Sequence, residues 1–511
     1  MYKFPDLYIV TRRMPAGNFV SMICVECKSA SPINSPSHIC RRCGGRLQVI
    51  LDMESAKENL TRESLERSIS RGVWRYEGLL PILNRKTIIS LGEGNTDLRK
   101  TDSLSQVLGS RWLYVKDETT NPSGAFVDRG MTVEISRARA LGFGAAAGGW
   151  SGNLASSLAA YCARGGMKSR AYIPADIDIG KLYQAVAYGA EIVPCDSAEE
   201  ANRSLIESQD KYYPVTARNA FFLEGVKTTG IEVVEQLNWN PPDWLVIPMG
   251  NGSHLAMTKK GLREIADIGL TKKASTRLVG VQVEGCSPIV DSMRDRKDAQ
   301  KAERHATIAW DIAIKNPRMG GEAATAIRES NGLAVAVTEA EILDAVELLA
   351  RSEGLFAEPA SASPVAAVRR MLDDGTMLRS ESVVCVITGT GLKDPLTARS
   401  IACKNKAARD IISRYEDSFR QGGIGDTKVQ IIRILLRGQN YAYAIRKELM
   451  SITNRSFTLT SIFQHLKELE DSGLIAVERR ERSPQRRIRV YYCLTPRGKE
   501  IVETLLPRDI S

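Results

Sequence analysis

The stretch that decides the fold of this 511-residue chain is WLYVKDETTNPSGAFVDR, residues 112–129. It begins with a short apolar run, Trp112–Val115, which ends in a polar loop containing Asn, Pro, Ser and Gly. Similar apolar runs recur at residues 169–173, 244–247 and 383–387. Most of them are followed by a helical pattern, and strands that alternate with helices are typical of a parallel sheet. We therefore predict an α/β fold for residues 56–410.

The composition fits a chain with a large core, since 43% of its residues are hydrophobic. It has no apolar run of about 18 residues, the length needed to span a membrane. Arg12 and Arg13 are not followed by an apolar segment, so the N-terminus does not resemble a signal peptide, and we expect a cytoplasmic protein. The net charge is +10, and arginines gather between Arg479 and Lys499, which indicates an anionic partner.

Two cysteine pairs lie in the first 55 residues: Cys24 with Cys27, and Cys40 with Cys43. Four thiolates at this spacing can surround one zinc ion, and Gly44 and Gly45 permit the tight turn after the second pair. Because four cysteines fill the coordination sphere, the zinc would be structural. Two disulfides or idle thiols are the alternative. Residues 1–55 are thus predicted to form a zinc ribbon.

Seven short motifs follow one another along the central region. They are LGEGNT (91–96), KDE (116–118), NPSGAF (121–126), SGN (151–153), GNGSH (250–254), EPASA (358–362) and TGTGLKDP (388–395). In this order they resemble the threonine synthases, which depend on pyridoxal phosphate (PLP). Many members of that family also carry a cysteine-rich N-terminal segment. The resemblance covers about residues 20–405 and implies a two-lobed parallel-sheet fold, the type II fold of PLP enzymes.

The resemblance also implies a role for each loop. Residues Gly250, Asn251, Gly252, Ser253 and His254 would hold the cofactor phosphate, since such a loop offers backbone N–H groups to an anion. Asn153 would bond the ring hydroxyl, and Thr388 would meet the pyridine nitrogen. The loop of Ser151, Gly152 and Asn153 would bind a substrate or effector carboxylate.

One departure from the family decides the mechanism. Threonine synthases carry an F-K-D-R segment whose lysine forms the Schiff base, and here Val127 takes the place of that lysine. An isopropyl group can neither form an imine nor carry a proton. Two further changes accompany it: His254 replaces the second asparagine of the glycine loop, and Thr390 stands where many relatives have histidine.

No neighbouring residue replaces the missing amine. Lys116, Lys181 and Lys227 lie elsewhere in the family's pattern, where we expect them to serve packing or surface charge. We predict no catalytic residue, and any PLP would be held non-covalently.

The C-terminal region is predicted to be separate, with a linker at 411–426 and a domain at 427–511. Three helical stretches precede two strands, and the third helix begins near Thr458 or Thr460 with Ile462, Phe463, Leu466 and Leu469 inward. This order resembles the winged-helix regulators of the PadR and MarR type, in which one helix enters the major groove of DNA and the wing reaches the backbone. The candidate DNA-contacting residues are Thr460, Ser461, Gln464, His465, Lys467, Arg482, Arg486 and Arg487.

Taken together, the sequence favours a homodimeric transcriptional regulator that binds operator DNA and senses PLP or an amino-acid-related effector. Two alternatives remain open. One is an active lyase that converts phosphohomoserine to threonine and also binds DNA. The other is a pseudoenzyme that pairs with an active paralogue.

Overall fold

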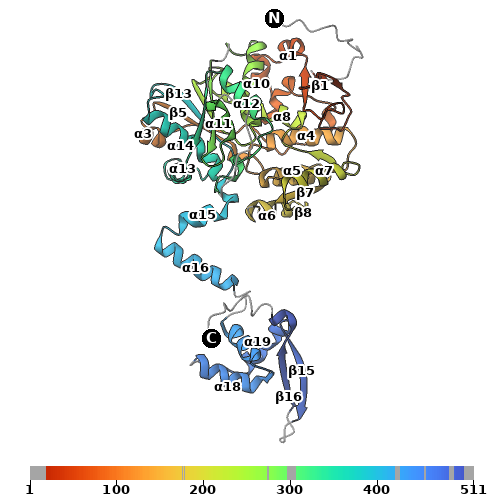
Figure 1. Cartoon of the computed structure of the whole chain (residues 1–511), viewed down its shortest axis with the longest axis vertical. Helices are drawn as coiled ribbons and strands as arrows, with labels where there is room; N and C mark the ends of the chain where they lie inside the picture. The colour runs from red at the N-terminus through yellow and green to blue at the C-terminus, as the bar shows by residue number, and fades with distance from the viewer. Residues whose placement is uncertain are drawn as a thin grey trace. The chain divides into compact units, whose positions relative to one another are not determined.

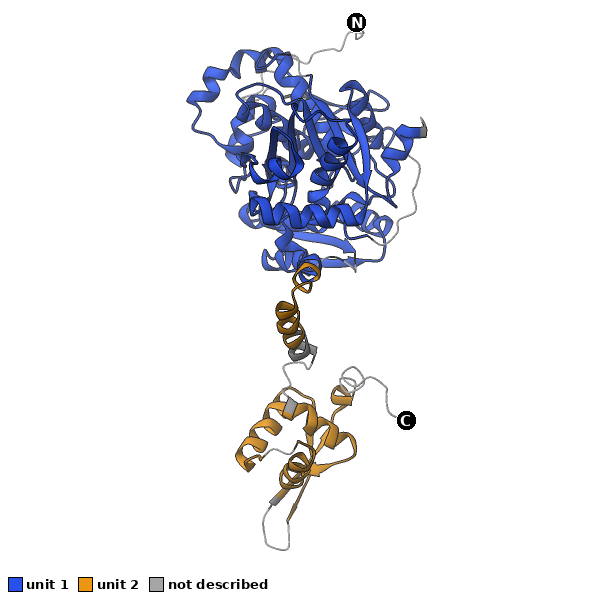
Figure 2. Ribbon diagram, turned by 90° about the vertical axis from the view of Figure 1, so that its left-hand side faces the viewer, with its two compact units in different colours: residues 1–399 blue, residues 400–511 orange. Residues whose placement is uncertain are grey.

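The computed structural model divides into two compact units, residues 1–399 and 400–511 (Figure 2). The structure describes residues 19–174, 177, 179–272, 275–295, 307–420, 426–453, 456–482 and 488–499. Each unit has its own buried core.

A six-stranded sheet forms the larger lobe of the first unit (Figure 1). Its strand order is β12 (Leu333–Val337), β11 (Arg277–Val283), β10 (Trp244–Pro248), β13 (Ser382–Ile387), β5 (Trp112–Asp117) and β4 (Leu98–Lys100). All neighbours are parallel except β4 and β5. Every residue of β10 is buried, so both faces of the sheet are covered, as is usual for parallel sheets.

A four-stranded parallel sheet forms the smaller lobe. Its order is β8 (Glu191–Cys195), β7 (Lys168–Pro174), β6 (Ala145–Gly149) and β9 (Tyr213–Val215). The helices that pack around the two sheets begin and end as follows: α1 Met53–Asn59, α2 Arg62–Arg67, α3 Ser103–Leu108, α4 Asp128–Ala140, α5 Gly152–Arg164, α6 Ile179–Ala187, α7 Ala198–Glu207, α8 Ala220–Val226, α9 Thr228–Gln236, α10 Ser253–Asp267, α11 Pro288–Asp295, α12 Gly320–Glu329, α13 Glu339–Glu353, α14 Pro359–Asp373 and α15 Pro395–Ala402. The predicted two-lobed α/β fold is confirmed.

Local sequence signals explain where these helices start and stop. Helix α13 begins at a capping box in which Thr338 and Glu341 bond each other's backbone N–H groups, and it ends at Gly354 with φ +65°. Helix α5 begins at Ser151, whose hydroxyl accepts from the N–H of Leu154. The Ser151 cap fixes the start of α5 and therefore the position of Asn153, the second residue of that helix.

The N-terminal residues form a small antiparallel sheet of β2 (Ala30–Ser31), β1 (Phe19–Cys24) and β3 (Leu47–Leu51). Its inner face, which includes Met22 and Leu47, shares one buried cluster with Val73, Val133 and Phe221 of the larger fold. The cysteine-rich segment is therefore packed onto the first unit.

The second unit contains the helices α16 (Lys406–Arg420), α17 (Asp426–Leu436), α18 (Ala442–Thr453) and α19 (Leu459–Asp471) and a sheet of β14 (Asn440–Tyr441), β16 (Ile488–Leu494) and β15 (Ile475–Arg482). Helices α17 to α19 and the hairpin enclose a core that includes Ile431, Ile445, Leu466 and Leu494. The predicted order of three helices followed by a hairpin is confirmed.

Two details of this unit differ from the sequence prediction. Residues 411–420 of the predicted linker lie in helix α16, because Ala408, Ile411, Ile412 and Tyr415 follow helical spacing. Phe463, predicted to point inward, is 51% exposed, since Ile462, Leu466 and Leu469 already fill the buried side of α19.

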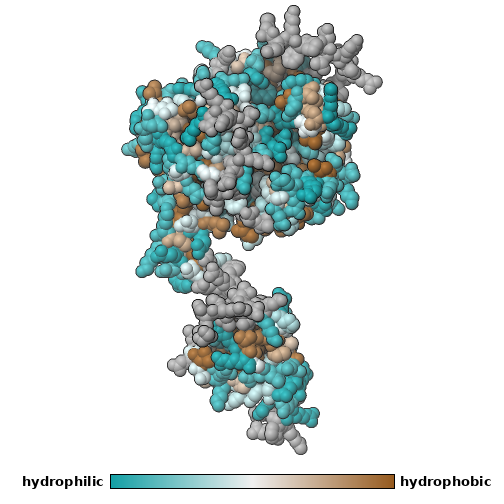
Figure 3. Space-filling view, viewed as in Figure 1, coloured by the Kyte–Doolittle hydropathy of each residue, from teal (hydrophilic) through white to brown (hydrophobic). Residues whose placement is uncertain are grey.

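Among the described residues, no helix is long and apolar enough to cross a membrane. In the view of Figure 3, hydrophilic residues cover most of the coloured surface of each unit, with hydrophobic residues in small groups.

Candidate functional site

Three segments from distant parts of the first unit are joined by backbone hydrogen bonds. The N–H of Phe126 donates to the carbonyl of Thr388 at 2.9 Å, and the N–H of Thr390 donates to Gly124 at 3.0 Å. The N–H of Glu358 donates to the carbonyl of Gly389 at 3.1 Å. The predicted motifs NPSGAF, EPASA and TGTGLKDP therefore meet at one place, at the carboxyl ends of β5 and β13.

Val127 lies directly before helix α4 and is 7% exposed. It belongs to an apolar cluster with Ala125, Met131, Leu154 and Met257. An aliphatic side chain is thus accommodated among apolar neighbours at position 127.

Asn153 occupies the centre of a buried polar cluster. Its amide nitrogen donates to Glu358 Oε1 at 3.1 Å and to Asp311 Oδ2 at 3.2 Å. Burial raises the pKa of Glu358, although Lys181 opposes this effect. Neither Glu358 nor Asp311 was a predicted site residue; Glu358 stands in a quoted motif, whereas Asp311 belongs to no motif.

Two lysines complete this cluster, which we call the Asn153 cluster and which comprises Asn153, Lys181, Asp311, Glu358 and Lys393. Lys181 Nζ lies 2.7 Å from Asp311 Oδ2 and 3.2 Å from Glu358 Oε2. Lys393 Nζ donates to Asn153 Oδ1 at 3.1 Å. Lys181 was expected to serve packing or a surface charge, but it lies in this cluster, because α6 folds over the start of α5 and brings its side chain against Gly152.

The glycine loop is shaped by close backbone contacts. Gly252 has φ +87°, and a Cβ at this position would meet the carbonyl oxygen of Met319 at 2.6 Å. A Cβ on Gly250 would meet the carbonyl oxygen of Asp311 at 2.2 Å. Only glycine fits at either position. The loop leads directly into the 15-residue helix α10, whose first N–H groups have no partner within the helix.

His254, in the first turn of α10, stacks in parallel on Phe126 with the ring centroids 4.1 Å apart. Its Nε2 lies 3.2 Å from the hydroxyl of Thr229, and its buried Nδ1 has no hydrogen-bond partner among the described residues. Burial lowers the pKa of His254 to about 4, so the ring is neutral at pH 7. The two rings are in contact, which leaves no room for a third ring between them.

Thr388 lies at the end of β13 and shares a 2.7 Å hydrogen bond with Ser361, whose hydroxyl donates to Glu358 Oε1 at 3.3 Å. Thr388 is therefore linked to Asn153 through Ser361 and Glu358. The predicted residues of all three loops are thus brought together, with Asp311 and Glu358 as the connecting groups.

The chain's residues fit a PLP molecule on two structural grounds. The first N–H groups of α10, directly after the glycine loop, have no partner within the helix, which suits a phosphate. The unpartnered Nδ1 of His254 adds a side-chain hydrogen-bonding group at the same helix start.

A second buried network lies beneath the site. Arg129 contacts Glu118 at 2.6 Å and Glu232 at 2.8 Å, and Lys116 contacts Glu232 at 2.6 Å. The two positive charges lower the pKa of Glu232 despite its burial. Lys227 is likewise buried and paired with Glu224 and Glu264. Lys116 and Lys227 are therefore structural, as predicted for packing.

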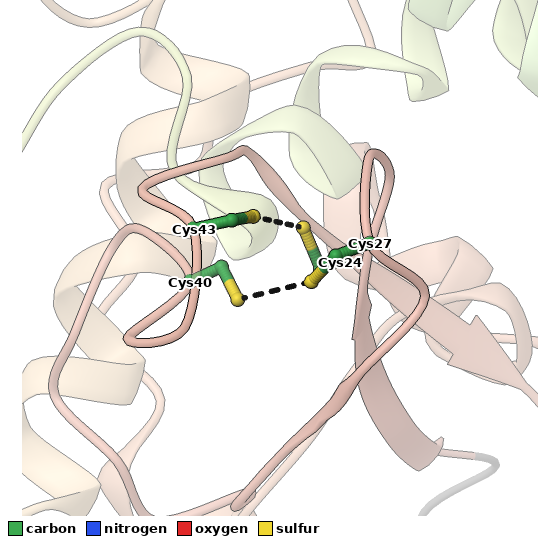
Figure 4. Close-up of side chains that lie close together, drawn as sticks. All are labelled: Cys24, Cys27, Cys40 and Cys43. Carbon is green, nitrogen blue, oxygen red and sulfur yellow. Dashed lines mark hydrogen bonds between the residues drawn. The ribbon is translucent and has the colours of Figure 1, made fainter.

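The four N-terminal cysteines converge, and their sulfur atoms all lie within 4.8 Å of one another (Figure 4). The Sγ atoms of Cys24 and Cys43 are 3.5 Å apart, and those of Cys27 and Cys40 are 3.7 Å apart. Tetrahedral zinc with its usual Zn–S bonds requires about 3.8 Å between sulfurs. Gly44 has φ +74°, as the predicted tight turn needs. The residues fit a structural zinc ion.

Replacing Cys40 by alanine is expected to lower the unfolding free energy by about 1–3 kcal/mol, because a structural zinc site contributes folding energy that the packed ribbon would lose. Elemental analysis should find one zinc per wild-type chain and much less in the variant. Cys385→Ala, which removes a buried thiol in β13 away from this cluster, is the control for zinc content. Unchanged thermal stability of the wild type after complete chelation would contradict the prediction.

The predicted DNA-contacting residues that the structure describes lie on helix α19 and at the end of strand β15. Thr458 caps α19, with its hydroxyl 3.1 Å from the N–H of Ser461. Thr460, Gln464 and Lys467 are exposed, and Ser461 and His465 are half-buried. Gln464 Nε2 donates to Glu468 at 3.1 Å. Arg482 is exposed at the end of β15, whereas Arg486 and Arg487 lie outside the described residues.

The comparisons with known proteins agree with this arrangement. Residues 89–389 match the family described as "Pyridoxal-phosphate dependent enzyme", and residues 431–504 match the "Transcriptional regulator PadR-like family". A threonine synthase of Methanocaldococcus jannaschii is 40% identical over 73% of this chain and 92% of its own length. A threonine synthase of Methanosarcina acetivorans is 37% identical over 79% of this chain and 99% of its own length. The solved L-serine ammonia-lyase of Rhizomucor miehei covers 58% of this chain and 93% of its own with a TM-score of 0.50, which at 20% identity shows the fold alone.

Proposed function

The chain belongs to the pyridoxal-phosphate-dependent enzyme family and carries a C-terminal PadR-like domain, and from this premise we propose that it is a transcriptional regulator whose enzyme-like core senses a ligand. The effector is PLP or an amino-acid-related compound. The core keeps the ligand-binding framework of its threonine synthase relatives but uses it to control DNA binding.

The observation that carries this proposal is Val127. It is buried in an apolar cluster at the position where the resemblance to the threonine synthases leads us to expect the Schiff-base lysine, and a valine cannot move a proton. The glycine loop and Asn153 are nevertheless retained and closely packed. A pocket without its catalytic amine, in one chain with a DNA-binding fold, is suited to sensing.

In this proposal each retained residue binds or orients the ligand. The N–H groups of the 250–254 loop and His254 Nδ1 hold the phosphate, and Asn153 bonds the ring hydroxyl. Thr388, kept in place by Ser361, faces the pyridine nitrogen. Ser151 and Gly152 hold the effector carboxylate at the start of α5. Bound PLP supplies an aldehyde that can react with an amine.

The second unit supplies the DNA contacts. Helix α19 presents Thr460, Ser461, Gln464, His465 and Lys467 to the major groove, and the arginines of the hairpin reach phosphates. We propose a homodimer, because two such helices read two half-sites of an operator. The test is an anisotropy titration of operator DNA with and without PLP, threonine and phosphohomoserine.

Replacing Arg482 by alanine is expected to weaken binding to all DNA by about 5-fold at 0.15 M salt and to reduce the salt slope by about 1, because one phosphate contact is lost. The matched control is Arg139→Ala, which removes one exposed arginine from the first unit and should change neither value. Gln464→Ala should instead alter the preference between operator sequences. Equal affinities of the Arg482 and Arg139 variants would show that Arg482 does not contact DNA.

The alternative function, an active threonine synthase with a DNA-binding domain, is favoured by the 40% identity to the Methanocaldococcus enzyme over most of that protein. It differs from the regulator in one measurable property, the rate of phosphate release from phosphohomoserine.

A further inference from the structure

The lysines near the site are the candidates for a substitute amine. Lys116 and Lys227 are fully buried and paired with Glu232 and with Glu224 and Glu264, respectively. Their nitrogens are held by these carboxylates outside the Asn153 cluster. Among the described residues of that cluster, the amines are those of Lys181 and Lys393.

Lys393 lies against the segment that lacks the lysine. A Cβ on Gly124 would meet Lys393 Cε at 3.2 Å and Nζ at 3.7 Å. Gly124 is three residues before Val127, and because it has no Cβ it leaves space for the Lys393 side chain. The side chain is 6% exposed, so it is held inside the site and not at its rim.

Lys393 is also held by the residue proposed to bind the cofactor ring. Its Nζ donates to Asn153 Oδ1 at 3.1 Å, while the amide nitrogen of Asn153 points to Glu358. In pyridoxal the ring hydroxyl and the aldehyde are on adjacent carbon atoms. If Asn153 bonds the ring hydroxyl as proposed, Lys393 Nζ would lie on the side of the ring that carries the aldehyde.

The two lysines differ in their charge environment. Lys181 contacts both Asp311 and Glu358. Burial lowers the pKa of Lys393 to about 8; Glu358, Asp128 and Asp311 oppose this effect, while Lys181 adds to it. At pH 7 roughly a tenth of Lys393 is then neutral, against roughly one part in 3,000 for a lysine with its usual pKa.

We propose that Lys393 supplies the amine that position 127 lacks and forms a reversible C=N bond with the aldehyde of PLP. This inference rests on the proposed function and adds to it the chemistry by which the ligand is held. The lone pair of the neutral Nζ adds to the carbonyl carbon, and the nitrogen loses its two protons. The carbonyl oxygen leaves with them as water, so the step needs no oxidant or reductant.

The test is borohydride reduction of the full-length protein after incubation with PLP, followed by digestion and mass spectrometry. We expect the pyridoxyl group on the peptide containing Lys393, and formation of the bond that speeds up as pH rises through about 8. Lys393→Arg keeps the charge but cannot form the bond, so its labelling should fall at least 10-fold. Lys57→Arg, at an exposed lysine of α1, is the matched control and should label like wild type. Labelling of another lysine in place of Lys393 would overturn the inference.

A second ligand separates this inference from the proposed function. Pyridoxine phosphate has an alcohol in place of the aldehyde, so it can occupy the pocket but cannot form a C=N bond with Lys393. Calorimetry should show that the wild type binds it, and a thermal unfolding curve like that of the wild type would show that Lys393→Arg folds. If wild type binds pyridoxine phosphate but no label reaches Lys393, the inference fails and the sensing pocket stands. If neither compound binds, both the inference and PLP sensing fail.

Discussion

Purified protein supplied with PLP and phosphohomoserine is expected to release phosphate at least about 10²–10⁴-fold more slowly than a threonine synthase assayed beside it. This factor is the usual contribution of a positioned acid–base group, and Val127 has no group that takes or gives a proton. The measurement is phosphate release under conditions in which the reference enzyme is saturated. Turnover within 10-fold of the reference would identify the chain as an active enzyme and remove the regulator's main support.

A variant that carries an amine at residue 127 tests this interpretation further. Val127→Lys is expected to attach PLP at residue 127, although the longer side chain must fit into an apolar cluster at a cost of about 1–3 kcal/mol. Val127→Met has a similar length without an amine, and it is the matched control for this packing effect. If the two variants bind PLP alike, residue 127 does not face the cofactor.

A covalent bond to Lys393 does not conflict with slow turnover. Lys393 follows β13, whereas residue 127 precedes α4, so the two amines approach the ligand from different segments. A misplacement of 1 Å in a reacting group can reduce a rate about 10²-fold. Lys393 can therefore hold the aldehyde without being positioned to move the substrate's proton.

The effector is expected to change operator affinity by roughly 5- to 150-fold, the usual range of allosteric coupling. A ligand shifts DNA binding only if it binds the two states of the protein unequally, so tight binding alone is insufficient. The measurement is the anisotropy titration at two salt concentrations, with PLP, threonine and phosphohomoserine added separately. The direction of the change distinguishes an inducer from a corepressor.

One pair of variants tests whether this response originates in the Asn153 cluster. Asn153→Ala removes the hydrogen bonds to Glu358, Asp311 and Lys393 and should abolish the response while leaving DNA binding without ligand intact. Asn240→Ala, at an exposed asparagine before β10, should respond like wild type. Absence of sequence-specific DNA binding under every condition would favour the paralogue-partner alternative.

The sequence predicted the fold and the loops of the site because both depend on local patterns. Apolar runs followed by helices predicted a parallel α/β fold, the resemblance to the threonine synthases implied its two lobes, and the four-cysteine spacing predicted a cluster that the structure brings within 4.8 Å. The Asn153 cluster could not be predicted in the same way. Asp311 belongs to no motif, and it reaches Asn153 only because residues 311–319 cross the glycine loop.

The roles of the lysines also depend on contacts that no local sequence pattern reveals. Lys393 stood in a quoted motif, but its role depends on burial and on a contact with Asn153, 240 positions earlier in the chain. The sequence predicts packing or a surface charge for Lys181, because no local pattern reveals that α6 covers Gly152. Helical spacing predicts that Phe463 points inward, but spacing does not show how much of the surface of α19 the neighbouring elements can cover.

The strand order of the six-stranded sheet has a consequence for synthesis of the chain. Strand β13 lies between β10 and β5 and pairs along the whole length of β5, yet β5 ends at Asp117 and β13 begins at Ser382. At roughly 5–20 residues per second, tens of seconds pass on the ribosome before this partner emerges. Throughout that interval the hydrogen-bonding edges of β5 and β10 lack their shared neighbour, and unpaired edges attract other chains. The yield of native protein therefore depends on how well the nascent chain is shielded until β13 has been made.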